Sequence, residues 1–352
     1  MVMARSCDRR LRTICIVVLV TYALSNFLYV TFNREPPSLL LLANATWWKA
    51  NMPPYNMSLL AADDLKFLVD KPGFKFLINN KRCEGSNSIF LVVFIHSAPA
   101  NFRNRQVIRD TWGREDNLPQ DLIRVVFLLG SVTDPFMQRR INQENNLYHD
   151  IVQGNFFDSY RNLTYKHVMG LKWVTHYCRQ ARFIFKADDD IFVDIFQLTN
   201  FLKETFGPTG GVANIMMCYV YRTPPVKRSQ RSKWRVSFKE YPGRYYPSYC
   251  AGWGIILSPD VVFKLYLQSS KIPYFWVDDV HVTGTLAELV GVSHLDFTEK
   301  LDVNNIDIEK WIDSKDVMRP YLFGTPNSDM ATILTLWNRT LQYYQRPALS
   351  HR

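Results

Sequence analysis

Three consecutive aspartates, Asp188, Asp189 and Asp190, are the residues of this 352-residue chain best suited to chemistry. Apolar runs precede them at 183–185 and follow them at 191–193. Adjacent carboxylates repel one another, and apolar surroundings make their charge costlier, so a bound cation is the simplest compensation. Mg²⁺ and Mn²⁺ take oxygen ligands and commonly complete their shells with substrate phosphates. The segment therefore predicts a strand end that holds a metal ion and a nucleotide diphosphate, with a solvated acidic turn as the alternative.

A second acidic pair, Asp278 and Asp279, follows the aromatic residues Phe275 and Trp276. A carboxylate held away from bulk water can have a raised pKa, which suits a general base. Asp279 could instead cap a helix that runs through Leu289, and the two interpretations are compatible.

Glycines and basic residues supply further candidates. Gly252 and Gly254 would let the backbone approach a ligand, with Trp253 between them either stacking on a sugar ring or packing in the core. His294 is a borderline ligand that suits Mn²⁺ better than Mg²⁺, although a lone histidine is more often an ordinary surface or core residue. Guanidinium groups after the first strand could bind phosphate oxygens or could form a solvated helix face: Arg103, Arg105 and Arg109.

The elements that must position these residues alternate between strand and helix. Apolar runs predict strands at 89–95, 123–129, 149–152 and 183–187, and periodic patterns predict helices near 109–112, at 138–148 and at 164–178. This order indicates a mostly parallel α/β sheet with helices on both faces, whose ligands bind at the carboxyl ends of the strands. The chain has no GxGxxG fingerprint and no P-loop, so NAD and ATP enzymes of the usual kinds are not indicated.

Composition narrows the partners and the compartment. The formal net charge of +10 suits an anionic membrane surface or anionic substrates, and without a zinc-finger spacing or a long basic run nucleic acid is the least favoured partner. Six cysteines form no CxxC pair, which argues against zinc. Four of them lie beyond the N-terminal segment and leave three pairings open in an oxidising compartment: Cys83, Cys178, Cys218 and Cys250.

The N-terminal region predicts membrane attachment. Residues 1–13 contain four arginines and precede the uncharged stretch 14–32, which is long enough for a signal-anchor helix; a cleaved signal peptide is the alternative. The positive-inside rule keeps 1–13 in the cytosol and places the rest in the lumen. Residues 33–87, rich in proline, are expected to form a stem, and residues 88–345 the catalytic domain.

Six motifs in order resemble the β-1,3-galactosyltransferase family, which includes N-acetylglucosaminyl-, N-acetylgalactosaminyl- and Fringe-like transferases. The motifs are Arg103-x-Arg105 with Ile108-Arg-Asp-Thr-Trp-Gly113, Phe127-Leu-Leu-Gly130, Asp158-Ser-Tyr-x-Asn-Leu-Thr-x-Lys166, Lys186-Ala-Asp-Asp-Asp-Ile-Phe-Val193, Tyr246-Pro-Ser-Tyr-x-x-Gly-x-Gly254 and Asp278-Asp-Val280. Each motif is modest, but the ordered set is specific, and it covers about residues 88 to 300.

The resemblance implies a GT-A fold, a UDP-sugar donor, Mn²⁺ and an inverting transfer that makes a β1→3 linkage to an acceptor glycan. It implies that Asp190 binds the metal, with His294 near a second ligand position, and that Asp279 deprotonates the acceptor 3-hydroxyl. Donor-binding roles fall to Ser97, Arg103, Arg105, Arg109, Asp188, Asp189, Gly252 and Gly254.

The expected protein is a single-pass Golgi enzyme with galactose as the first choice of donor sugar, and N-acetylglucosamine or N-acetylgalactosamine as alternatives. A non-catalytic lumenal lectin or chaperone on the same scaffold is an alternative from another class, and a homodimer is a candidate assembly. His281, Ile255 and Gly284 depart from the family's usual pattern where donor or acceptor preference could be set.

Overall fold

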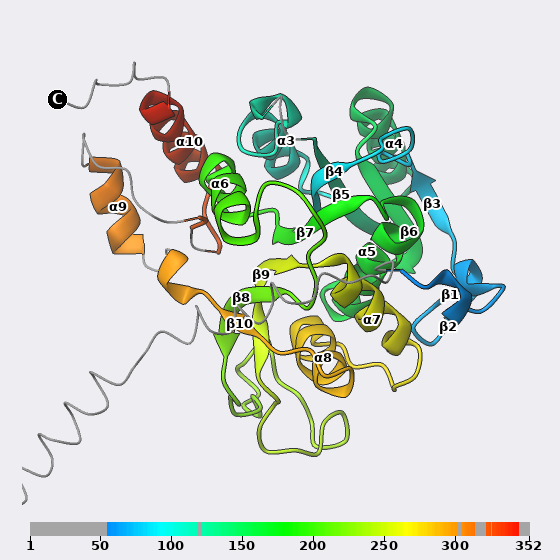
Figure 1. Ribbon diagram of the computed structural model, residues 1–352. Coiled ribbons are helices and arrows are strands. Elements are labelled where there is room, and N and C mark those ends of the chain that lie inside the picture. The colour runs from blue at the N-terminus through cyan, green and yellow to red at the C-terminus, as the bar shows by residue number, and fades with distance from the viewer. Residues whose placement is uncertain (1–54, 119–121, 302–304, 314–321, 325, 345–352) are drawn as a thin grey trace, which may run out of the picture. The chain divides into compact units, whose positions relative to one another are not determined.

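The computed structural model describes residues 55–118, 122–301, 305–313, 322–324 and 326–344 (Figure 1). The chain divides into two units, Met1–Asn44 and Ala45–Arg352, and all described residues belong to the second. The predicted tail and membrane span, 1–13 and 14–32, lie outside the described residues. Within the described part, no helix has the length and apolar character needed to cross a membrane.

An eight-stranded mixed sheet forms the centre of the domain, in the order β10-β8-β9-β7-β4-β5-β6-β3. Its strands are β3 Phe76–Asn79, β4 Ile89–His96, β5 Ile123–Ser131, β6 Ile151–Phe157, β7 Ala181–Asp188, β8 Met216–Tyr221, β9 Tyr249–Leu257 and β10 Leu295–Asp296. The central strands β7, β4, β5 and β6 are parallel, as predicted. The sheet is mixed because β9 is antiparallel to both β7 and β8, and β3 is antiparallel to β6.

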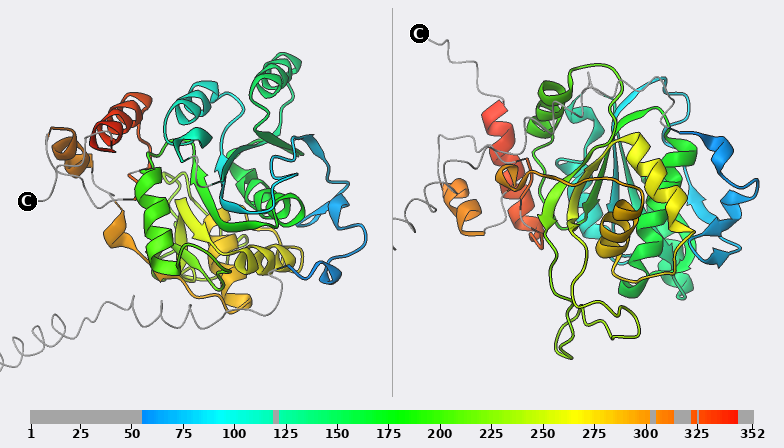
Figure 2. Two further views of the ribbon diagram at one scale, coloured as in Figure 1. Left: turned by 45° about the horizontal axis from the view of Figure 1, so that its top comes forward. Right: turned by 60° about the horizontal axis from the view of Figure 1, so that its bottom comes forward.

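Helices cover both faces of the sheet (Figures 1 and 2). They are α3 Phe102–Asp110, α4 Pro135–Tyr148, α5 Leu163–Tyr177, α6 Ile195–Phe206, α7 Pro259–Ser269, a π-helix Asp279–Leu286 continuing into α8 Ala287–Leu289, α9 Asn305–Asp313 and α10 Met330–Tyr344. Short 3-10 turns occupy Met57–Leu59, Asp64–Lys66, Glu115–Asn117, Tyr160–Asn162 and Thr298–Lys300. One apolar core lies between the sheet and α5, α7 and the π-helix, and the other lies between the sheet and α3, α6 and α10.

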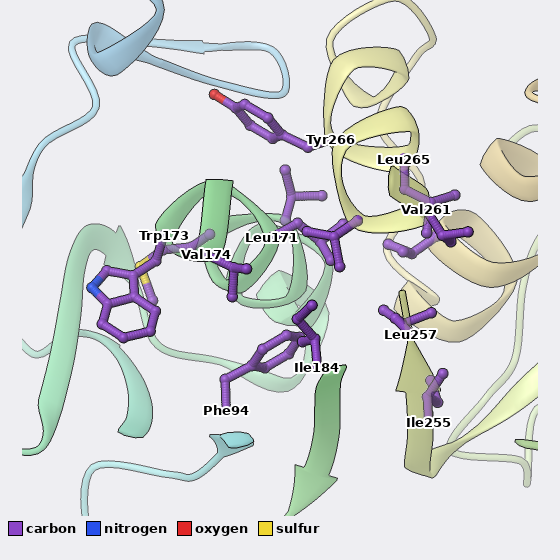
Figure 3. Packing of buried hydrophobic residues seen from close by; sticks show 14 of the residues in the cluster. Phe94, Leu171, Trp173, Val174, Ile184, Ile255, Leu257, Val261, Leu265 and Tyr266 are labelled. Carbon is purple, nitrogen blue, oxygen red and sulfur yellow. The ribbon is translucent and has the colours of Figure 1, made fainter. Parts of the chain in front are cut away.

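The two cores together explain why the central strands are mostly apolar. In Figure 3, Leu171 and Val174 of α5 lie over the sheet residues Phe94 and Ile184, and Val261 of α7 lies over Leu257 of β9. Every residue of β4 is buried, because a strand covered on both faces has no solvent side. Burial on both faces likewise explains the apolar runs of β5 and β7 that are visible in the sequence.

Local signals set the helix limits more sharply than periodicity does. α4 begins at Pro135, three residues before the predicted start, because the Asp134 carboxylate accepts hydrogen bonds from the amides of Phe136 and Met137. The strand predicted at 149–152 begins two residues later, since His149 takes a left-handed conformation that ends α4.

Two disulfides, Cys83–Cys178 and Cys218–Cys250, select one of the three pairings that the sequence leaves open. The first joins the segment before β4 to the end of α5, and the second joins the neighbouring strands β8 and β9. Disulfides of this kind are typical of secreted and lumenal proteins.

Part of the predicted stem is folded onto the domain. Residues 67–72 form a two-stranded sheet, β1 Phe67–Leu68 and β2 Lys71–Pro72, and Leu68 is fully buried in the first core. Asp64 anchors this segment, since its carboxylate accepts hydrogen bonds from Tyr266 at 2.5 Å and lies 2.7 Å from His176 Nε2 and 3.2 Å from the ammonium of buried Lys172.

We expect Asp64→Ala to lower the free energy of unfolding at pH 7 by about 2 kcal/mol, because it leaves Lys172 without its carboxylate. Burial opposes the charge on Asp64, but the bonds from His176, Tyr266 and Lys172 outweigh it and lower its pKa to about 2. The carboxylate therefore stabilises the fold above pH 4, and this contribution is lost as the pH falls toward 2.

Denaturant unfolding of both proteins at pH 7 and pH 2 would measure the effect. Asp63→Ala, at the exposed neighbouring position, is the matched control and should leave stability unchanged. A difference between wild type and Asp64→Ala that persists in full at pH 2 would contradict the electrostatic explanation.

Candidate active site

The aspartate triplet lies at the carboxyl end of β7, and its three side chains have different surroundings. β7 ends at Asp188, whose carboxylate is 36% exposed and accepts a 2.6 Å hydrogen bond from Lys186 Nζ. Asp189 and Asp190 lie in the turn that follows, so the strict alternation of an extended strand does not continue to Asp190.

Asp189 ties the turn to the loop after β4. It is buried and accepts hydrogen bonds from Ser97 Oγ at 2.6 Å and from Asn101 Nδ2 at 3.0 Å. Burial raises the pKa of Asp189, and these two bonds partly offset that effect. Arg105 donates to Ser97 Oγ and to the Ala98 carbonyl, and its guanidinium also pairs with Glu144 at 2.7 Å.

Asp190 has the environment expected of a carboxylate that needs a cation. Burial, reinforced by the charges of Asp188 and Asp189, raises the pKa of Asp190 to about 6. Its carbonyl accepts the Ser328 amide at 2.9 Å, and its carboxylate interacts with the Asn327 amide. The segment 326–328 therefore packs on the triplet, and none of the motifs pointed to it.

The second acidic pair opens the π-helix that packs against β9. Asp279 is its first residue, and a Cβ placed on Gly252 of β9 would lie only 2.1 Å from Asp279 Oδ1. Asp278 occupies the helix-cap position without making a side-chain cap, so the capping interpretation does not account for either carboxylate.

Lys186 connects the two acidic segments. Its buried ammonium donates to the Asp188 carboxylate and to the Gly252 carbonyl, next to Asp279. Burial opposes its charge, but Asp188, Asp279 and Asp278 outweigh burial and raise the pKa of Lys186. One cation therefore serves carboxylates from two distant parts of the sequence, which places them in one site.

The neighbouring carboxyls Asp278 and Asp279 have opposite pKa shifts. Burial raises the pKa of Asp279 well above the usual range, and the charge of Asp278 raises it further. Burial acts in the same sense on Asp278, but a hydrogen bond with His167 and the charge of Lys186 lower the pKa of Asp278 overall. Such a split is typical of a pair in which one carboxyl transfers a proton and the other keeps its charge.

A histidine pair lies behind Asp278. His167 Nδ1 is 3.2 Å and His96 Nδ1 4.0 Å from Asp278 Oδ2, and all three side chains are buried. Ligand atoms from these residues lie within 4.8 Å of one another, so the group could hold a metal ion by residue type. Burial lowers the pKa of both histidines, which keeps the imidazoles neutral at pH 7.

Of the three arginines predicted to bind the donor, one is exposed and two are paired with carboxylates of the protein. Arg103 is exposed on α3. Arg109 pairs with Asp150 at 2.7 Å and with Glu144 at 2.8 Å, so a donor phosphate would compete with carboxylates for it, as it would for Arg105.

The glycines of β9 make room for the protein's own side chains. Gly252 accommodates Asp279, and a Cβ on Gly254 would lie 2.4 Å from the ring of Phe323. Trp253 is buried against the same Phe323 ring, which confirms the core interpretation for this tryptophan.

His294 Nε2 is 2.6 Å from the Thr283 carbonyl oxygen, and its assignment as a metal ligand stays a prediction. Ile255 and His281, which depart from the family pattern, are both buried. A pocket of about 340 Å³ beside Asp70 and Tyr165 contains none of the predicted site residues, and its polar groups bond to one another: Tyr165 to Asp70, and Asn155 to the backbone of Gly73 and Lys75.

We expect Gly252→Ala to slow the reaction by about 100-fold, because the new methyl group would displace Asp279, and a misplacement of about 1 Å can cost that much. Gly211→Ala is the control, since a Cβ there meets nothing within 4 Å. Turnover and thermal unfolding should be measured together. Normal turnover by a folded Gly252→Ala protein would show that the close approach to Asp279 is not needed.

An α/β sheet with carboxylates gathered at the end of a central strand is a typical active-site arrangement of an enzyme. The chain belongs to the galactosyltransferase family, whose sequence model matches residues 103–298, and within it to the β-1,3-glycosyltransferases. It is similar to β-1,3-galactosyltransferase 1 of Homo sapiens and of Mus musculus, each 38% identical over 223 residues, which are 63% of this chain and 67% of the relative.

Lactosylceramide 1,3-N-acetyl-β-D-glucosaminyltransferase A of Danio rerio is 34% identical over 228 residues, which are 62% of this chain and 59% of that relative. Among solved structures, the galactosyltransferase LgtC in complex with donor and acceptor sugar analogues matches 74% of this chain and 98% of its own, with 11% identity and a TM-score of 0.35. That TM-score is too low to establish a common fold.

Proposed function

We propose that the protein is an inverting β-1,3-glycosyltransferase of GT-A type, which moves galactose from UDP-galactose to the 3-hydroxyl of an acceptor glycan on a glycoprotein or glycolipid. The observation that carries the proposal is the meeting of the triplet and Asp279 around the buried ammonium of Lys186. The triplet can then bind the donor while Asp279 acts on the acceptor.

The chemistry assigned to the chain's own residues is simple. Asp279 takes the proton of the acceptor hydroxyl while the hydroxyl oxygen bonds to the anomeric carbon of the donor sugar. The bond between that carbon and the oxygen of UDP breaks at the same time. Attack opposite the leaving group inverts the anomeric centre. The neighbours of Asp279 are themselves held in place. Lys186 bonds to the carbonyl of Gly252, which lies beside Asp279, and His167 bonds to the adjacent Asp278.

The residues at the triplet fit a divalent cation. Asp190 is a partly buried oxygen donor with a raised pKa, next to two further carboxyls, and we assign Asp190 and, as predicted, His294 to Mn²⁺. When bound, the ion would supply positive charge to the diphosphate of the departing nucleotide. Asp188, with its exposed carboxylate, remains assigned to the donor side of the site.

The donor sugar has a second candidate. The Danio rerio relative is named as an N-acetylglucosaminyltransferase and has an identity close to that of the galactosyltransferases, which supports UDP-N-acetylglucosamine as an alternative donor. The two disulfides support the lumenal placement of the domain, in a Golgi membrane protein of type II topology. A non-catalytic lectin or chaperone would have no need of the opposite pKa shifts at Asp278 and Asp279.

A donor panel tests the proposal. The purified lumenal domain, residues 33–352, would be incubated with UDP-galactose, UDP-N-acetylglucosamine or UDP-N-acetylgalactosamine, with β-linked acceptors, and with Mn²⁺ or EDTA. We expect transfer with one donor in Mn²⁺ and none in EDTA, and linkage analysis should show a β1→3 bond. Failure of all three donors to react in Mn²⁺ would refute the enzymatic proposal.

A further inference from the structure

The loop between β8 and β9, residues 222–248, is strongly basic, and we name it the basic arm. Residues 222–244 contain eight lysines or arginines and one acidic residue, Glu240. Figures 1 and 2 show this segment extending beyond the sheet as a long loop. Nothing in the reaction proposed above uses its charge.

Most of these cations are free to bind a ligand. Arg222 pairs with Asp296 at 3.0 Å, and Arg228 donates to three carbonyls of the arm, which fixes the loop's course. The other six are exposed and have no carboxylate partner among the described residues: Lys227, Arg231, Lys233, Arg235, Lys239 and Arg244.

The root of the arm packs on the segment that carries the proposed base. Val236 and Tyr246 share a small apolar cluster with Phe275, Trp276 and Val280, which flank Asp278 and Asp279. A 2.8 Å ion pair between Arg161 and Glu240 adds a second attachment. The arm is therefore held beside the acceptor side of the site.

A line of side chains leads from the arm to the carboxylates. Trp234 is 48% exposed and interacts with the Tyr160 hydroxyl, and the Tyr160 ring lies 6.1 Å from that of Trp276. Burial raises the pKa of Tyr160, and the charges of Asp278, Asp279 and Asp188 raise it further, so Tyr160 lies near both acidic segments. Aromatic rings can stack on sugar rings, so Trp234 is suitably placed to contact an acceptor.

We propose that the basic arm binds an acceptor glycan that carries carboxylate or sulfate groups near its reacting hydroxyl. The inference rests on the proposed function and adds the class of acceptor to it. Arg231, Lys233 and Arg235 surround Trp234 in the sequence, so an anionic group and a sugar ring could be recognised together.

The attachment of the arm to the site favours a glycan over a lipid surface as the partner. A cation lies over one face of each exposed ring: the Arg228 guanidinium is 4.1 Å from the Phe238 ring centroid and the Lys233 ammonium 4.5 Å from that of Trp234. A loop that bound lipid would need no attachment to the catalytic site, whereas the root of the arm packs on the segment that carries Asp278 and Asp279.

Binding can be measured without any turnover. A fluorescently labelled, galactose-terminated tetrasaccharide bearing sulfate groups, and its unsulfated counterpart, would be titrated with the lumenal domain and followed by anisotropy. We expect the sulfated form to bind on the order of 10-fold more tightly at low salt, and this preference to disappear near 1 M salt, where screening is strong.

The triple variant R231Q/K233Q/R235Q should lose the preference while binding of the unsulfated glycan is retained. The control, R114Q/R139Q/R140Q, removes three exposed cations on the α3 and α4 side of the sheet and should keep the preference. Equal binding of both glycans by the wild type would overturn the proposal.

A lipid partner gives a different result. Sedimentation with phosphatidylserine vesicles that depends on the three cations, without any glycan preference, would reassign the arm to a membrane surface. Because these measurements need no UDP-sugar, their outcome is independent of the donor panel, so failure of the arm proposal and failure of the enzymatic proposal can be told apart.

Discussion

Asp279→Asn is expected to lower the rate of sugar transfer by about two to four orders of magnitude while leaving binding of the donor unchanged. The carboxamide has the size of the carboxylate and fits beside Gly252, but it cannot accept the proton of the acceptor hydroxyl. Single-turnover transfer and calorimetric binding of UDP would separate the two effects.

The pH dependence gives an independent test of Asp279. Burial and Asp278 raise its pKa, and only the ionised form can act as a base, so wild-type activity should fall as the pH drops through this pKa. The residual activity of Asp279→Asn should lack that acidic limb. Asp110→Asn, on the exposed side of α3, is the control and should behave as the wild type. An Asp279→Asn protein that transfers sugar at the normal rate would end the assignment of Asp279 as the base.

The parts of the fold that follow from local chemistry could be predicted from the sequence. β4, β5 and β7 appear as mostly apolar runs because both of their faces are covered, and the triplet begins at Asp188, the last residue of β7. The antiparallel strand β9 could not be placed this way, since its pairing with β7 depends on a connection of about 60 residues rather than on its own pattern.

The site required contacts that a linear sequence does not encode directly. The sequence predicts a close backbone approach at Gly252, but only the fold shows that the side of Gly252 where a Cβ would stand faces Asp279. Lys186 carries a signal of its own in the sequence: a lysine inside the apolar strand 183–187 must find carboxylates, and only the fold shows that these come from both acidic segments. The packing of 326–328 on Asp190 had no comparable signal.

Asp190→Asn is expected to weaken Mn²⁺-dependent binding of UDP by at least about 10-fold, because an amide oxygen is a poorer ligand for a hard cation than a carboxylate. The same change should stabilise the metal-free protein at pH 7. The folded-state pKa of Asp190 is about 6, above its ordinary value of 3.8, so ionisation at higher pH opposes folding. We expect a gain of about 1–3 kcal/mol in the free energy of unfolding.

Loss of binding together with a gain in stability distinguishes a functional carboxylate from a structural one. If a carboxylate only holds the turn together, removing its charge lowers the stability of the protein. If the carboxylate is kept in place for a cation, removing its charge raises the stability of the metal-free protein. Calorimetric titration of UDP with Mn²⁺ and denaturant unfolding in EDTA measure the two quantities on one preparation. Asp188→Asn provides the comparison: if it abolishes the Mn²⁺ dependence and Asp190→Asn does not, the ion belongs to Asp188.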